Sequence, residues 1–164
     1  YLQIPNSHVM KKKIFWALLI ILVIIQFIRP EKNRSTAISA NDLSKHYAIP
    51  ANVQDILGRA CNDCHSNNTK YPWYSEVQPV GWWLQNHVND GKRNMNFSEY
   101  TSYKPDDQHH LMEELIEEVK EGHMPLNSYL WVHKEAKLSA EEKEALLIWA
   151  GVVAEQIKAK HNLQ

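Results

Sequence analysis

The sequence has almost no excess of charge of either sign and very few cysteines. Its 164 residues include 18 lysines and arginines against 19 acidic residues, giving a formal net charge of -1. So balanced a chain implies no broad basic face, and we therefore expect no nucleic-acid partner. With only two cysteines, a zinc site would need further thiolates or well-spaced histidines that the sequence does not supply.

Alternation of polar and apolar residues, the pattern of strands, is also lacking after the first thirty residues. Apolar residues recur instead at the helical spacing of i, i+3, i+4 and i+7. Pro105 in a first turn, Gly122 just past a helix end and the Ser139 to Glu142 capping box add start and stop signals. The sequence predicts an all-α domain with helices near residues 42–47, 50–60, 80–91, 105–121 and 139–158, and a loop at 95–103.

Both cysteines fall in one short motif, Cys61-Asn62-Asp63-Cys64-His65. This is the C-x-x-C-H pattern of c-type haem attachment. Two thiols at this spacing can each add to a vinyl group of one porphyrin edge, and the following histidine can bind the iron. The motif predicts one covalent haem c per chain, attached through Cys61 and Cys64 with His65 as an axial iron ligand.

Other interpretations of the motif remain open. A dithiol redox pair would need a βαβ context that the helical pattern does not offer. Half of a zinc site lacks its partners. A simple disulfide between Cys61 and Cys64 would give no reason for His65.

The second axial ligand is expected in the segment Gly122-His123-Met124-Pro125. Met124 follows a helix in a proline-held loop and lies far from His65 in the sequence, so it can fold over the opposite haem face. It could equally be gap-filling core. Met112 belongs to a helical apolar stripe, and Met95 has no such context. His87 falls on an apolar helix face, where a histidine is usually a satisfied core residue.

The N-terminal part carries a different signal. Lys11, Lys12 and Lys13 precede the apolar run IFWALLIILVIIQFI at residues 14–28, which is typical of an export signal. No cleavage site follows closely, so we expect an uncleaved single-pass helix in the inner membrane, with the C-terminal domain in the periplasm. The expected divisions are an upstream extension or expression remnant at 1–9, a signal anchor at 10–30, a linker at 31–50 and the haem domain at 51–160.

Several further motifs give the chain a resemblance to a known family. Tyr71-Pro72-Trp73-Tyr74, then Gln78-Pro79-Val80 with Trp82-Trp83-Leu84, follow the C-x-x-C-H motif, and Gly122-x-Met124-Pro125-Leu126 comes later. Together, over about residues 41–151, they resemble the small cytochrome-c-like haem-binding domain family of exported bacterial proteins.

The resemblance implies a cytochrome-c-type helical fold in which the helix before Cys61 packs on the C-terminal helix. It implies haem ligated by His65 and Met124. By likeness to cytochromes c, a proline carbonyl accepts the ring N-H of the proximal histidine, with Pro79 as the candidate and Pro72 as the alternative. Trp73, Trp83 and Pro79 are expected around the haem.

The leading functional prediction is an electron carrier without catalysis of its own, whose redox partner the sequence does not name. The alternatives are a gas sensor, redox sensor or peroxidase-like enzyme with an open distal iron face and His123 as acid or base, and a membrane-tethered thiol oxidoreductase that uses Cys61 and Cys64.

Overall fold

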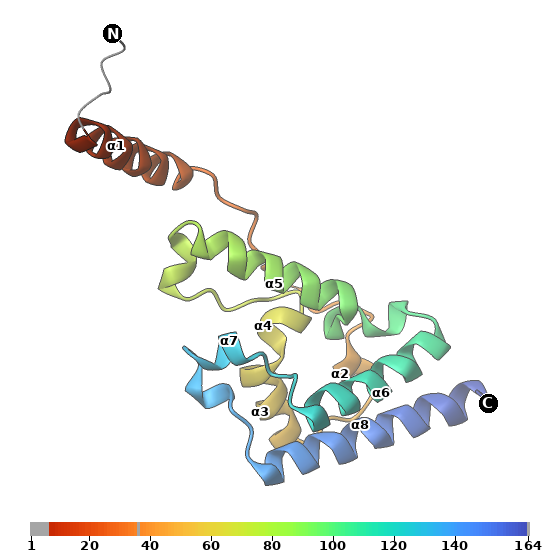
Figure 1. Cartoon of the computed structure of the whole chain (residues 1–164). Coiled ribbons are helices and arrows are strands. Elements are labelled where there is room, and N and C mark those ends of the chain that lie inside the picture. The colour runs from red at the N-terminus through yellow and green to blue at the C-terminus, as the bar shows by residue number, and fades with distance from the viewer. Residues whose placement is uncertain (1–6, 36, 164) are drawn as a thin grey trace. The chain divides into compact units, whose positions relative to one another are not determined.

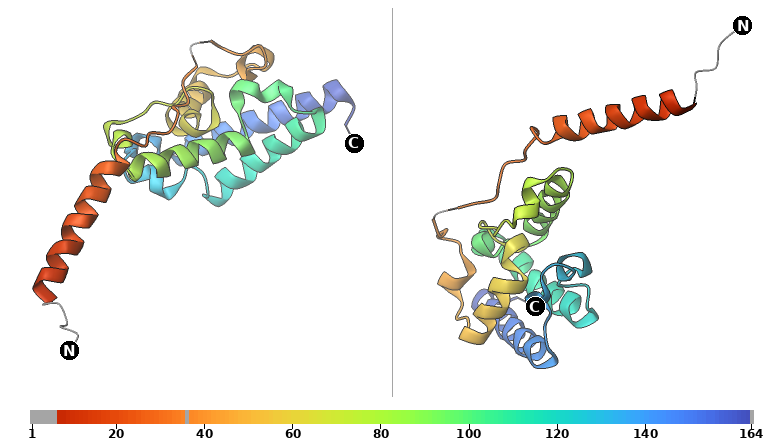
Figure 2. Two further views of the ribbon diagram at one scale, coloured as in Figure 1. Left: turned by 90° about the horizontal axis from the view of Figure 1, so that it is seen from above. Right: turned by 90° about the vertical axis from the view of Figure 1, so that its left-hand side faces the viewer.

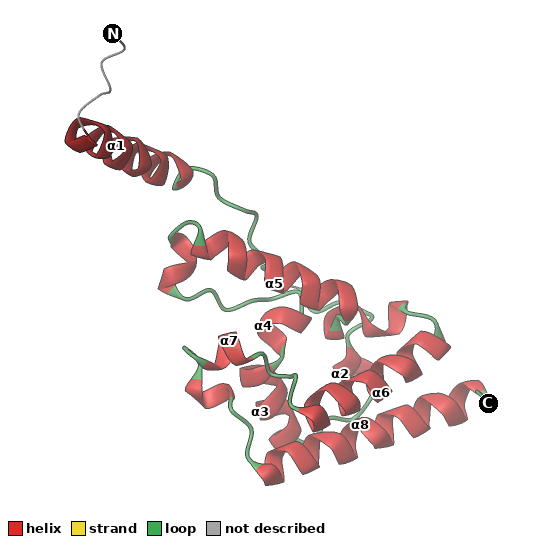
Figure 3. Cartoon of the chain, viewed as in Figure 1, coloured by secondary structure: helices red, strands yellow, loops and turns green. Residues whose placement is uncertain are grey.

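The computed structural model describes residues 7–35 and 37–163. Residues 1–6, most of the predicted upstream extension, lie outside this part. The described chain is helical and has no strand (Figure 3), with a single isolated antiparallel bridge between Arg34 and Asn68. The prediction of an all-α protein is therefore confirmed. The helices are α1 Ser7–Ile25, α2 Leu43–His46, α3 Ala51–Ala60, α4 Asn62–His65, α5 Val80–Asn94, α6 Pro105–Glu121, α7 Asn127–Leu130 and α8 Ala140–His161, with 3₁₀ turns η1 Trp73–Glu76, η2 Phe97–Ser102 and η3 Lys134–Ala136.

The chain forms two compact units. One contains α1, the segment up to residue 32 and residues 71–87; the other contains residues 33–70 and everything from residue 88 onward. The second unit holds the haem motif and the Met124 segment, and it contains the main hydrophobic core.

The core of the second unit is built on α8. Helix α6 packs along α8, and α3 packs against α8 as the resemblance implies; the views in Figures 1 and 2 agree on both neighbours. Leu146, Val153 and Ile157 lie on the buried face of α8, one or two turns apart, and are almost fully buried. This packing fixes the direction in which α3 delivers the chain to Cys61.

Local sequence signals set the limits of these helices. Ser139 caps α8 in a complete capping box with Glu142. Pro105 occupies the first turn of α6, and Gly122 ends it with a left-handed φ of 83°, a conformation that glycine adopts without a steric penalty. Helices α6 and α8 thus lie close to their predicted limits.

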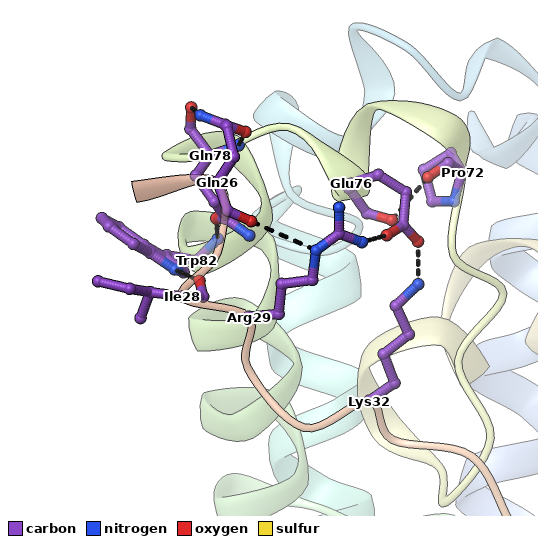
Figure 4. Close-up of polar contacts among 9 residues, drawn as sticks. Gln26, Ile28, Arg29, Lys32, Pro72, Glu76, Gln78 and Trp82 are labelled. Atoms are coloured by element: carbon purple, nitrogen blue, oxygen red, sulfur yellow. Dashed lines mark hydrogen bonds and ion pairs between the residues drawn. The ribbon is translucent and has the colours of Figure 1, made fainter. Parts of the chain in front are cut away.

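The first unit is held by polar contacts between residues 26–32 and the segment that leads into α5 (Figure 4). The Gln26 side chain bonds both backbone groups of Gln78, at 2.9 and 3.1 Å. The Trp82 indole donates to the carbonyl of Ile28 at 2.7 Å. Glu76 pairs with Arg29 at 2.6 Å and also with Lys32. These contacts hold residues 26–32 against the segment that leads into α5, within the first unit.

The predicted transmembrane helix is wrong. No helix among the described residues has the length and apolarity needed to cross a membrane. Helix α1 takes in Lys11, Lys12 and Lys13 and ends at Ile25. Its uncharged part, residues 14–25, rises only about 18 Å, whereas the hydrocarbon core is about 30 Å thick. This finding contradicts the predicted single-pass anchor in the inner membrane.

Two further predictions about the helices need correction. Gly91 does not end its helix, because α5 continues to Asn94. The expected loop at 95–103 contains the 3₁₀ turn η2, whose start is capped by the Asn96 side chain bonding the Ser98 N-H at 3.0 Å. Both features place side chains against the motif described next.

Candidate functional site

The C-x-x-C-H motif folds as a sharp change of direction between two helices. Cys61 ends α3 and begins α4. Its carbonyl accepts from the backbone N-H groups of Cys64 and His65, at 3.1 and 3.0 Å. The first of these bonds links the two cysteines, which lie three positions apart, within one turn of the backbone. Both are free thiols.

A cavity of about 540 Å³ opens beside this turn. It brings His65 and Met124, distant in sequence, into one lining together with Cys61. Most of the other lining side chains are apolar, and four polar ones, Arg93, Asn94, Glu114 and Glu118, complete it. The remaining lining residues are Ala60, Met95, Phe97, Leu115, Val119, Pro125, Leu138 and Leu146.

Other predicted site residues lie elsewhere. Cys64 belongs to the motif but is not among the residues that line the cavity. Trp73, Trp83 and Pro79 belong to the first unit and do not line it either. Trp73 is 80% exposed and Trp83 is 50% exposed. Their predicted place around the haem stays a prediction.

The ring of His65 is oriented by a backbone carbonyl. Its Nδ1 lies 3.0 Å from the Met95 oxygen, which as an acceptor fixes the proton on Nδ1 and leaves Nε2 free as a ligand atom. The expected acceptors were Pro79 or Pro72, and the structure corrects this. The Pro79 carbonyl accepts from Trp83 N-H inside α5, and the Pro72 carbonyl from Ser75.

The environment keeps His65 neutral. Burial lowers the pKa of its imidazole, and the carbonyls of Met95 and Gly91 offset this only in part. A neutral ring is the form that binds a metal. For the cysteines, burial raises the pKa of Cys61 to about 12 and that of Cys64 to about 11. Both therefore remain protonated near neutral pH.

Helix α5 touches the motif at Gly91. A Cβ at this position would lie 2.7 Å from the carbonyl oxygen of Cys64 and 2.9 Å from its Cβ. Only a residue without a side chain allows α5 to approach Cys64 so closely. Apart from the glycine itself, no pattern in the sequence indicates this contact.

A polar network holds the chain immediately after His65. Asn67 donates to Glu99 at 2.8 Å and accepts from Asn96 at 2.9 Å. Glu99 also accepts from Ser39 at 2.8 Å and Asn41 at 3.3 Å. These hydrogen bonds, with that from Ser39 first, lower the pKa of the Glu99 carboxyl. Glu99 is therefore an anionic anchor for the segment that follows the iron-ligand candidate.

Met124 is held at the end of α6. Its backbone N-H and that of His123 both donate to the Glu118 carbonyl, at 3.1 and 2.9 Å. The Met124 side chain is partly buried and packs against the core. The His123 ring instead lies exposed, 3.5 Å from the carboxylates of Glu118 and Glu121.

Met112 and His87, which were also considered as iron ligands, have other contacts. Met112 is fully buried in the core, which agrees with its helical stripe. The His87 ring lies against Trp83, with ring centres 4.3 Å apart, and its Nδ1 is 2.8 Å from the Trp83 carbonyl. Within residues 7–35 and 37–163, no three histidine, cysteine or acidic side chains form a group that could hold a metal ion.

Comparison with known families indicates a cofactor class for the chain. The family model described as haem-binding domain matches residues 20–151. The chain belongs to the haem-binding domain family. No curated protein and no solved structure matches it.

The cavity of this haem-binding domain suits its cofactor. Its volume lies in the range of about 300–1,000 Å³ that ligand pockets have, and its apolar walls suit a porphyrin. An imidazole and a thioether line the same cavity, and both are known haem iron ligands. A cysteine also lines it.

We predict that Gly91→Ala in this haem-binding domain displaces the C-x-x-C-H motif. Alanine favours a helix over glycine by about 1 kcal/mol, but the clash with Cys64 outweighs this gain. Thermal unfolding should shift to lower temperature, and the fraction of protein that carries haem should fall. Gly58→Ala is the matched control, since a Cβ there meets nothing within 4 Å, and it should stabilise the protein. Equal behaviour of the two variants would contradict the close contact.

We also predict an acid dependence that originates at Glu99. Because folding lowers the pKa of this carboxyl, its stabilising effect is present above the unfolded value of about 4.3. The effect is lost as the pH falls through the lower, folded value. Glu99→Gln should therefore lower stability at neutral pH and make it less dependent on pH below about 4.3. Urea unfolding from pH 7 downward measures this; Glu117→Gln, on the exposed face of α6, is the control, and parallel curves for all three proteins would refute the assignment.

Proposed function

We propose that the protein binds one haem c covalently and transfers single electrons, with His65 and Met124 as the axial iron ligands. The observation that carries this proposal is the single cavity lined by Cys61, His65 and Met124 in a chain of the haem-binding domain family. Bound haem supplies a one-electron iron couple, and the protein supplies attachment, ligands and surroundings.

The cysteines attach the porphyrin edge. Each thiol adds across one vinyl group, so that sulfur bonds to one carbon and the thiol hydrogen passes to the other. This addition needs no oxidant and gives one thioether per cysteine. Attachment to a single ring requires both thiols to reach one porphyrin edge, and the spacing of three positions between Cys61 and Cys64 supports this.

The two axial groups differ in how they are held. His65 offers Nε2 because the Met95 carbonyl occupies Nδ1. Met124 offers a soft thioether, which favours ferrous iron and raises the reduction potential. With both axial positions filled by the protein, no position remains for a substrate. Electron transfer is then better supported than catalysis.

The alternatives have less support from the geometry. A thiol oxidoreductase needs a thiolate, whereas burial raises the pKa of both cysteines far above neutrality. The acid or base expected for a peroxidase-like site was His123, which does not line the cavity; its ring lies 3.5 Å from the carboxylates of Glu118 and Glu121. These observations favour the carrier over both.

The covalent attachment has a direct test. Protein coexpressed with a haem-attachment system should keep its haem after acid and organic extraction, and its pyridine haemochrome should show saturated vinyl positions. Cys61→Ala and Cys64→Ala should each leave one vinyl group unsaturated and shift that spectrum. Haem that extracts fully from the unaltered protein would contradict a c-type attachment.

The axial assignment predicts the behaviour of Met124→Ala. Loss of the thioether should make the iron high-spin, allow rapid carbon monoxide binding in the ferrous state, and lower the reduction potential by about 59 mV or more, which is tenfold in a one-electron equilibrium. Optical spectra and potentiometry measure these changes. His123→Ala is the matched control and should leave all three unchanged.

Two results would redirect the proposal. A low-spin Met124→Ala protein together with a high-spin His87→Ala or His123→Ala protein would indicate two histidine ligands. Rapid carbon monoxide binding by the unaltered protein would favour the sensor or peroxidase-like function.

A further inference from the structure

One hydrogen bond links the Met124 segment to the haem-attachment motif. The Tyr129 hydroxyl, on α7, donates to Oδ2 of Asp63 at 2.8 Å. Asp63 lies between the two cysteines, and Tyr129 lies a few residues after Met124. Both belong to the second unit. The contact therefore joins the two segments that supply the candidate iron ligands.

The tyrosine end of this contact is held by further contacts. The Tyr129 N-H donates to the Leu126 carbonyl at 3.0 Å, and its own carbonyl accepts from His133 N-H at 3.0 Å. The rings of Tyr129 and His133 are stacked, with centres 4.1 Å apart and planes inclined by 14°. Burial, and the hydrogen bond to Asp63 after it, raise the pKa of the Tyr129 hydroxyl, so it remains a donor.

The aspartate end is fixed as well. Oδ1 of Asp63 accepts from the Lys70 N-H at 3.0 Å, and its carbonyl accepts from the Thr69 hydroxyl at 2.6 Å. The carboxylate is thus presented to Tyr129 by the backbone that follows His65. A hydrogen bond to a carboxylate is stronger than one between neutral groups.

We propose that Tyr129 and Asp63 form a positioning pair that holds the Met124 sulfur at the iron. The proposal rests on the ligation of Met124 proposed above. The Met124 segment has two attachments: the Glu118 carbonyl at its start and Asp63 at its end. The first fixes the segment to α6, and the second fixes it to the motif that carries the haem. Without the second, the sulfur should leave the iron more often.

Tyr129→Phe tests this in the full-length, haem-loaded protein, because it removes one oxygen and keeps the ring that stacks on His133. Carbon monoxide association to the ferrous protein should become about tenfold faster, the change expected for loss of one hydrogen bond to a charged group. The reduction potential should also fall, but by less than in Met124→Ala, because the thioether favours ferrous iron only while it is bound. Amide hydrogen exchange in residues 127–130 should also become faster.

Two further variants separate positioning from general stability. Asp63→Asn keeps an oxygen acceptor but not the charge, so its effects should have the same direction and be smaller; combined with Tyr129→Phe it should add little. Tyr71→Phe is the matched control, since that hydroxyl donates to Gln85 at 2.6 Å in the first unit. It should leave the potential and the carbon monoxide rate unchanged.

The outcomes distinguish this proposal from the one it rests on. Suppose that the unaltered protein binds carbon monoxide slowly and that Tyr129→Phe has the same carbon monoxide rate and the same potential as the unaltered protein. The positioning role is then overturned and the ligation by Met124 stands. A lower melting temperature of Tyr129→Phe does not change this conclusion. If unaltered protein binds carbon monoxide as fast as Met124→Ala, both fail. Should Tyr129→Phe not fold, the same measurements on Asp63→Asn decide, and values equal to the unaltered protein overturn the role.

Discussion

The hydrogen bond between His65 Nδ1 and the Met95 carbonyl is the interaction on which the site depends. It requires α5 to end where it does, because Met95 directly follows the last residue of that helix. It also requires α5 to lie against the motif, which the missing side chain at Gly91 permits. Ring orientation, tautomer and the freedom of Nε2 therefore all follow from where a helix ends. A backbone acceptor is insensitive to side-chain changes at its own position, so this orientation depends on helix packing more than on the identity of residue 95.

The surrounding structure resists movement of the motif on several sides. Helix α3 is fixed by its packing on α8, which sets the position of Cys61. Past His65, the chain is held by Asn67 through Glu99 and Asn96. The charge on Glu99 is stabilised by three side-chain donors, Ser39, Asn41 and Asn67, and by the nearby charge of Lys92. An electron-transfer site benefits from such restraint, because a ligand that moves little between oxidation states lowers the reorganisation that each transfer requires.

Two kinds of feature could be predicted from the sequence: helices with a periodic apolar pattern, and the C-x-x-C-H motif with its fixed spacing. Helices α6 and α8 follow from apolar residues at helical spacing and from Pro105, Gly122 and Ser139, and the C-x-x-C-H motif is readable from its spacing alone. The acceptor for His65 could not be found in this way, since a backbone carbonyl leaves no mark on the residue that carries it. The membrane helix was mispredicted because hydropathy was read from the apolar run, whereas the folded helix includes Lys11, Lys12 and Lys13.

The two segments that carry the candidate iron ligands are held in different ways. His65 lies in a segment fixed at short range, by the Cys61 carbonyl, by Met95 and by the network at Asn67. Met124 lies in a segment that contacts the motif through the hydrogen bond from Tyr129 to Asp63, with the Arg59 carbonyl 3.5 Å from the same hydroxyl. In a haem-loaded protein His65 should therefore stay bound to the iron, whereas Met124 should dissociate from it more readily. The reduction potential would depend largely on how firmly Met124 is held at the iron, because a thioether stabilises ferrous iron only while it is bound.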